Sequence, residues 1–204
     1  MAIIINNISK SYGGCSVLTN LSLSLEDNAV NCIFGPSGCG KSTLLSCIAG
    51  ITQPDKGSVE GIAGRSTAFA FQEPRLLPWK SVADNVDFAL NRTLGVSERA
   101  ELVKRSLELV ELSDSAALFP HQLSGGMSQR VSLARALAAD ADILLLDEPF
   151  SAIDNALKVT MIQRLAQLWS ARGTTVVIVT HDENEAAALD AVKFRPFDGT
   201  FEYF

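Results

Sequence analysis

The chain has 204 residues, 47% of them apolar, which suffices for one compact domain and excludes a disordered or fibrous protein. Its formal net charge of -6 argues against a nucleic-acid binder and against direct adhesion to anionic lipid, because both classes present basic faces. The apolar runs fall far short of the roughly 18 residues that span a bilayer, and we expect no signal peptide, so any work at a membrane needs another subunit.

The first part of the chain reads as strands and turns. Residues 2–5 form a β-rich run that is broken at residues 12–14, and residues 19–25 alternate apolar and polar side chains, the period of a half-buried strand. Residues 29–34 suit a strand buried on both faces. A glycine-rich turn follows, and then an apolar pattern at helical spacing that ends at Gly50.

That turn, Gly35–Thr43, matches the phosphate-binding pattern G-x-x-x-x-G-K-[ST] in full, with a buried strand before it and a helix after it. Its glycines let successive N–H groups point at an anion, and the helix N-terminus adds a positive end. We expect Lys41 to reach the β- and γ-phosphates of ATP and the Ser42 hydroxyl to ligate Mg²⁺. The other residues expected to bind the nucleotide here are Gly35, Ser37, Gly38, Cys39, Gly40 and Thr43. A plain strand-to-helix turn would not need all of these fixed positions.

The rest of the chain predicts an α/β fold. Residues 82–118 look helical, and we expect them to project as a helical subdomain over about residues 76–124. Buried-strand runs at 143–146 and 174–180 flank an amphipathic helix at 155–171, an alternation that indicates a parallel sheet with crossover helices. The predicted fold class is a P-loop NTPase with a mostly parallel sheet, flanking helices and an N-terminal antiparallel β part, in a single domain over residues 1–204.

Two carboxylates, Asp147 and Glu148, directly follow the buried run 143–146. Ligands of open α/β sheets bind at the carboxyl ends of strands, so Asp147 is placed to hold Mg²⁺ and Glu148 to polarise a water for attack on the γ-phosphate. The alternative is a pair of exposed acids that cap the next helix. The phosphate loop in the same chain favours the catalytic interpretation.

A second candidate anion loop consists of Ser124, Gly125 and Gly126 and opens another helix. Ser124 is a good N-cap, and the two glycine amides could approach an anion closely. Ordinary helix capping explains this loop equally well when it is taken alone. A chain that already has a phosphate loop gains nothing from a second one in the same site, so the pair predicts a composite site in which two chains facing head to tail bury two ATP molecules.

These motifs, in their order and spacing, resemble the nucleotide-binding domain of ABC transporters over roughly residues 2–190. The resemblance implies an ATPase with ATP and Mg²⁺ that powers transport. It implies that Tyr12 stacks on adenine, that Ser124, Gly125 and Gly126 contact the γ-phosphate held by the opposite subunit, and that Asp154 joins the two sites. It further implies that Gln72 senses Mg²⁺ and the attacking water, that His181 contacts the γ-phosphate, and that Glu148 is the general base. Tyr12 as a turn aromatic and His181 as a structural residue remain the alternatives, and His121 reads as structural.

Two departures qualify the resemblance. Met127 stands where the commonest signature has glutamine, and Lys193, Arg195 and Pro196 interrupt the apolar strand expected after Leu189.

Met127 and the segment Leu76-Leu-Pro-Trp79 resemble ATPases of the nitrate, sulfonate and taurine importer group, and riboflavin- or thiamine-precursor importers have related sequences. We expect the segment to contact a short helix of the membrane subunit. The alternative is that Trp79 packs under the helical subdomain.

The resemblance implies three partners: a second ATP-binding subunit in a homodimer, a membrane permease, and an extracytoplasmic solute-binding protein that acts through the permease, with no nucleic acid. The expected location is the cytoplasmic face of the inner membrane, peripheral through the permease, and the expected direction is import.

Three other classes of protein share some of the motifs. They are ATPases of chromosome maintenance, which split the two halves with a long coiled coil; ABC proteins of the ribosome, which usually carry two such domains; and small P-loop kinases, which need no second anion loop.

Overall fold

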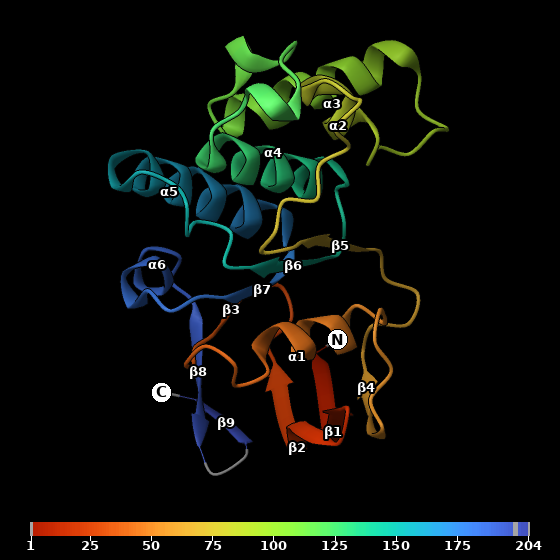
Figure 1. Cartoon of the computed structure of the whole chain (residues 1–204), viewed down its shortest axis with the longest axis vertical. Coiled ribbons are helices and arrows are strands. Elements are labelled where there is room, and N and C mark those ends of the chain that lie inside the picture. The colour runs from red at the N-terminus through yellow and green to blue at the C-terminus, as the bar shows by residue number, and fades with distance from the viewer. Residues whose placement is uncertain (1, 198–199, 204) are drawn as a thin grey trace.

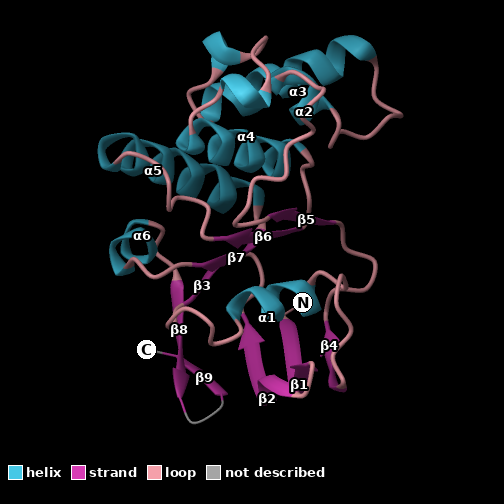
Figure 2. Ribbon diagram, in the orientation of Figure 1, coloured by secondary structure: helices cyan, strands magenta, loops and turns pink. Residues whose placement is uncertain are grey.

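The computed structural model of the chain describes residues 2–197 and 200–203. Two sheets organise these residues (Figures 1 and 2): a three-stranded antiparallel sheet of order β2-β1-β4, and a six-stranded sheet of order β5-β6-β7-β3-β8-β9. The strands are β1 (Ile3–Tyr12), β2 (Cys15–Leu25), β3 (Val30–Ile33), β4 (Lys56–Glu60), β5 (Thr67–Ala70), β6 (Ile143–Asp147), β7 (Thr175–Val179), β8 (Val192–Phe197) and β9 (Thr200–Tyr203). The helices are α1 (Lys41–Ile48), α2 (Val82–Asp87), α3 (Val96–Leu109), α4 (Gly125–Ala138), α5 (Asn155–Arg172) and α6 (Glu183–Ala188).

The antiparallel sheet follows the predicted alternation. The predicted break at residues 12–14 is a hairpin turn in which Gly13 and Gly14 both have positive φ, 56° and 84°, which glycine adopts without a steric penalty. On β2, Leu21, Leu23 and Leu25 are buried while the residues between them are exposed. The N-terminal antiparallel β part is therefore confirmed.

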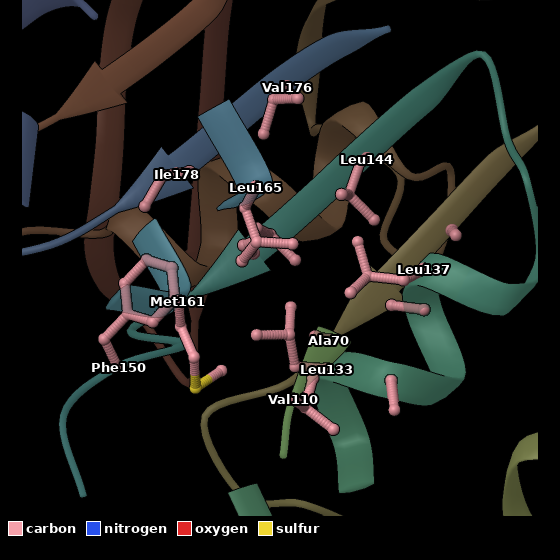
Figure 3. Close-up of a cluster of buried hydrophobic side chains, with 14 of the residues drawn as sticks. Ala70, Val110, Leu133, Leu137, Leu144, Phe150, Met161, Leu165, Val176 and Ile178 are labelled. Carbon is pink, nitrogen blue, oxygen red and sulfur yellow. The ribbon is translucent and has the colours of Figure 1, made fainter. Parts of the chain in front are cut away.

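The larger sheet confirms the predicted parallel arrangement and separates two cores. Its strands β5, β6, β7, β3 and β8 run parallel, and β9 alone is antiparallel. Leu144 and Leu146 face α4 and α5, as Figure 3 shows for Leu144 near Leu137 and Leu165. Ile143 and Leu145 face α1 and the antiparallel sheet. Each such fully buried aliphatic side chain contributes about 1.5–3 kcal/mol, so the sheet is a rigid base for the loops at its edge.

The helical region lies at one end of the molecule, beyond α4 (Figure 1). It is not one continuous helical run, because α2 ends at Asp87 and α3 begins at Val96. The turn before α2 is fixed by the fully buried Asn85: its Oδ1 accepts from Leu77 N at 2.8 Å, and its Nδ2 donates to the carbonyls of Leu77, Lys80 and Ser81 at 2.9–3.2 Å. This turn leaves Trp79 72% exposed, so Trp79 does not pack under the subdomain.

The sequence left three regions without a firm prediction. They are β4, which pairs with β1; α6, which Asp182 caps; and the strands β8 and β9. The charged residues Lys193 and Arg195 do not prevent β8, because its parallel pairing to β3 uses backbone groups and Phe194 is the buried residue between them. Among the described residues, none of the helices has the length and hydropathy needed to cross a bilayer.

Candidate functional site

The phosphate loop runs from the end of β3 into α1 and depends on glycine geometry. Gly38 and Gly40 have φ of 83° and 94°, values that other residues rarely adopt. A Cβ at Gly40 would lie 2.7 Å from the Leu18 side chain and 2.9 Å from the Val17 carbonyl oxygen. No side chain caps the N-terminus of α1, so the N–H groups of its first turn are available to an anion.

Lys41 lies within the loop rather than on the surface, with only 7% of the residue exposed. Its Nζ donates to the carbonyl oxygens of Gly35 at 2.7 Å and Pro36 at 2.9 Å. An ammonium group has three donors, and these two bonds leave one for a phosphate oxygen. The loop therefore holds a positive charge at the position predicted for the β- and γ-phosphates of ATP.

A cavity of about 300 Å³ adjoins this loop. It is lined by Val17, Ser37, Gly38, Gly40, Lys41, Ser42, Thr43, Gln72 and Glu148. Gln72 and Glu148, which are 76 positions apart, thus line the same cavity as the phosphate loop. A larger cavity, about 520 Å³, lies between α2 and α3 and has none of these residues in its lining.

Asp147 is the last residue of β6 and is 5% exposed. Burial raises the pKa of its carboxyl and the charge of Glu148 raises it further, while a hydrogen bond from Ser42 and the charge of Lys41 act in the opposite direction. A cation beside this carboxylate would offset its burial. Asp147, Ser42 and Gln72 offer the oxygen ligands that Mg²⁺ prefers, so the donor set fits this metal.

Glu148 has the left-handed backbone conformation, with φ of 48°, which is uncommon for a residue with a side chain. Its N–H donates to Val179 O at 2.9 Å, and its carbonyl oxygen accepts from Ser151 Oγ at 3.0 Å and Gln129 Nε2 at 3.1 Å. The side chain is 17% exposed. Its Oε2 lies 3.4 Å from Gln72 Nε2 and 3.8 Å from His181 Nδ1. The carboxylate is therefore held between two other predicted site residues, at the edge of the cavity.

His181 follows the end of β7 by two residues, after Thr180, and its side chain is 69% exposed. The residues on both sides of it are fixed. Thr180 Oγ1 donates to the buried Glu185 at 2.6 Å and accepts from Asp182 N at 3.1 Å. Lys158 of α5 donates to the same Glu185 carboxylate at 2.9 Å. This arrangement leaves the imidazole free to contact a ligand while its backbone stays in place.

The remaining predicted residues lie outside the cavity lining. Tyr12 is 49% exposed on the hairpin, with Lys10 Nζ 5.6 Å from its ring centroid. Ser124 caps α4 by accepting from Met127 N at 3.2 Å, and Gly125 is exposed beside it. Asp154 caps α5 by accepting from Ala156 N at 3.0 Å. The phosphate loop thus lines a cavity of the chain, whereas Ser124 and Gly125 lie exposed at the start of α4.

Gln129 lies in the segment 123–129 that carries part of the family resemblance, but the sequence indicated no role for it; it is buried and contacts the Glu148 carbonyl. His121, read as structural, is exposed and stacks on Phe119 with ring centroids 6.1 Å apart. Cys32 is fully buried in β3, and burial raises the pKa of its thiol to about 12.

Comparisons with known proteins identify the family of the chain. Residues 18–151 match the family model described as ABC transporter. An aliphatic sulfonates import ATP-binding protein of Corynebacterium glutamicum is 48% identical over 189 residues, which cover 92% of this chain and 77% of that protein. A taurine import ATP-binding protein of Chromobacterium violaceum is 43% identical over 198 residues, covering 92% and 76% of the two chains.

Solved structures show the same architecture. The dimeric structure of MJ0796, a bacterial ABC transporter cassette, superimposes with a TM-score of 0.87 at 32% identity and covers 98% of this chain and 96% of its own. A dimeric post-hydrolysis state of the same cassette, bound to ADP and Pi, gives a TM-score of 0.88 at the same identity and coverage.

Proposed function

The chain belongs to the ABC transporter family, as an ATP-hydrolysing subunit that works with a separate membrane permease, and from this premise we propose that it powers the import of organic sulfonates. The observation that carries the ATPase site is the position of Lys41, whose ammonium group lies within the phosphate loop and beside the Gln72–Glu148 pair. The substrate class comes from the sulfonate and taurine importers that the chain resembles, because taurine is itself a sulfonate.

The mechanism begins with nucleotide binding. The phosphate loop and Lys41 bind the β- and γ-phosphates, and Tyr12 on the exposed hairpin stacks on adenine. A second copy of the chain then presents its Ser124, Gly125 and Gly126 to the γ-phosphate, because these residues lie outside the cavity of their own chain. We expect Asp154 to join the two sites across this interface. Because both chains contact the nucleotide, ATP favours the closed pair of subunits.

Hydrolysis uses the residues gathered at the cavity edge. Glu148 accepts the proton of the attacking water, Gln72 orients that water, and His181 reaches toward the γ-phosphate. Mg²⁺, held by Ser42, Asp147 and Gln72, would neutralise the charge that develops on the phosphate oxygens. The like charges of ADP and phosphate then help the pair of subunits to reopen.

The expected assembly has the ATPase pair on the cytoplasmic face of the inner membrane, held there by the permease. An extracytoplasmic solute-binding protein delivers the solute to the other side of the permease. No part of the described chain needs to touch the solute, which is consistent with a cavity lined by a phosphate loop rather than by groups that would select a sulfonate.

The substrate proposal is tested with the complete transporter in vesicles that contain ATP. We expect uptake of a labelled aliphatic sulfonate or taurine to depend on ATP. The control is nitrate, an oxyanion that contains no sulfonate group. Uptake of nitrate without uptake of any sulfonate would contradict the substrate class and leave the ATPase assignment intact.

The permease contact is tested at Trp79, which the Asn85-bound turn leaves exposed. Trp79→Ala is expected to weaken co-purification with the permease by about tenfold or more, since a buried aromatic at the centre of an interface contributes about 2 kcal/mol or more. ATP binding by the isolated subunit should not change, because Trp79 is not in the cavity lining. Ile51→Ala, at another apolar residue with 58% exposure, serves as the control. Normal co-purification of the Trp79 variant would exclude this turn as the contact.

A further inference from the structure

The segment from Glu148 to Asp154 lies directly against the first turns of α4, and glycine makes this approach possible. A Cβ at Gly126 would lie 2.5 Å from the Ala152 carbonyl oxygen, which is too close for any side chain. The helix that begins at the serine–glycine loop therefore contacts the segment that contains the proposed general base. No other residue type at position 126 would allow the same contact without a backbone shift.

Gln129 follows Gly126 by one helical turn and extends this contact to Glu148 itself. It is 5% exposed, and its Nε2 donates to the Glu148 carbonyl oxygen at 3.1 Å. Four polar groups thus hold the Glu148 backbone: Val179 O accepts from its N–H, and Ser151 N, Ser151 Oγ and Gln129 Nε2 donate to its carbonyl. Of these four groups, only the Gln129 side chain belongs to α4.

The Glu148 backbone needs such support because its φ of 48° is a sparsely populated conformation. A residue of this kind costs about 1–3 kcal/mol and persists only when its surroundings fix it. The φ value determines where the carboxylate points, and here it points between Gln72 and His181. A small rotation of the Glu148 peptide would turn the carboxylate away from the cavity.

We propose that Gln129 is a positioning residue for hydrolysis. Its hydrogen bond to the Glu148 carbonyl fixes the Glu148 backbone and so the direction of the Glu148 carboxylate. Through this bond, docking of the serine–glycine loop on a nucleotide changes the position of that carboxylate. Ser124, Gly126 and Gln129 lie on the same helix start, so a displacement of this loop by the partner's nucleotide moves the donor that holds Glu148. The serine–glycine loop of a chain contacts the ATP bound by its partner, and Glu148 of the same chain hydrolyses the chain's own ATP. Gln129 thereby couples the two ATP sites. This inference rests on the proposed role of Glu148 as the general base.

The test compares steady-state ATP hydrolysis, by phosphate release, of the 204-residue chain and its Gln129→Leu variant. We expect kcat to fall by about 100-fold, the effect of misplacing a catalytic group by about 1 Å, with KM for ATP within twofold of the original. Binding of a fluorescent ATP analogue should be unchanged. Gln163→Leu, at an exposed glutamine of α5, is the matched control and should hydrolyse ATP normally.

The possible outcomes separate the two proposals. If Gln129→Leu melts at a lower temperature than the original chain, Gln129→Met is compared instead. Methionine keeps the length of the side chain but has no hydrogen-bond donor. An unchanged kcat in the folded variant, or a loss of kcat that only follows a loss of ATP binding, overturns the positioning role. Glu148→Gln is assayed in parallel: normal hydrolysis by that variant removes the base assignment itself, whereas a dead Glu148 variant beside a fully active Gln129 variant removes this inference alone.

Discussion

Glu148→Gln is expected to stop ATP turnover, with a loss of at least about 100-fold, while ATP binding is preserved. Glutamine matches glutamate in shape but cannot accept the proton of the attacking water. The backbone bonds to Val179 and Gln129 are independent of the side chain, so the fold and the cavity should remain. Because hydrolysis no longer separates the subunits, the variant should form a stable dimer in ATP, measured by light scattering.

The control for this prediction is Glu183→Gln, at an exposed glutamate of α6. It should hydrolyse ATP at the original rate and remain monomeric under the same conditions. Turnover by Glu148→Gln close to the original rate would refute the assignment of Glu148 as the general base. Asp147 and Glu148 would then be read as acids that cap the next helix. A dead variant that stays monomeric in ATP would instead count against the head-to-tail pair.

Lys41→Ala is the second large effect, a loss of ATP affinity of about 100-fold. A charged hydrogen bond is worth about 1.5–3 kcal/mol, and the ammonium also supplies the charge that faces the triphosphate. The chain should still fold, because the carbonyls of Gly35 and Pro36, which Lys41 binds, belong to a loop that is partly open to water. Equilibrium titration with ATP measures the loss, and the melting temperature without nucleotide checks the fold.

Lys104→Ala serves as the matched variant, since Lys104 is 68% exposed and makes only a 3.9 Å pair with Glu108 on the same helix. Its ATP affinity should equal that of the unchanged chain. If Lys41→Ala bound ATP equally well, the phosphate-loop assignment would fall, and with it the composite site.

The phosphate loop could be predicted from the sequence because its chemistry is local. One glycine pattern between a buried strand and a helix fixes both the backbone and the position of Lys41. Strands β6 and β7 were predictable for a related reason, since strands buried on both faces are continuous apolar runs. The N-cap at Ser124 was equally local and is confirmed by its bond to Met127 N.

Other features depend on contacts between distant residues and had no local signal. Strand β8 exists despite Lys193 because its backbone pairs with β3, more than 150 positions earlier, as Cys32 opposite Lys193 shows. The exposure of Trp79 depends on the Asn85 side chain, and the contact of α4 with Glu148 depends on Gln129. Periodicity predicts which face of an element is buried, but it cannot predict which side chain bonds to a given carbonyl.

Asn85 has a thermodynamic consequence for assembly. One buried amide bonds to three residues of the turn that carries Trp79, so this turn is ordered when the chain folds. A flexible loop would lose conformational entropy on association, at a cost of about 0.5–1.5 kcal/mol for each immobilised side chain. In this protein most of that conformational entropy is lost when the chain folds. Binding to a permease therefore loses less entropy, and the same contacts give a higher affinity.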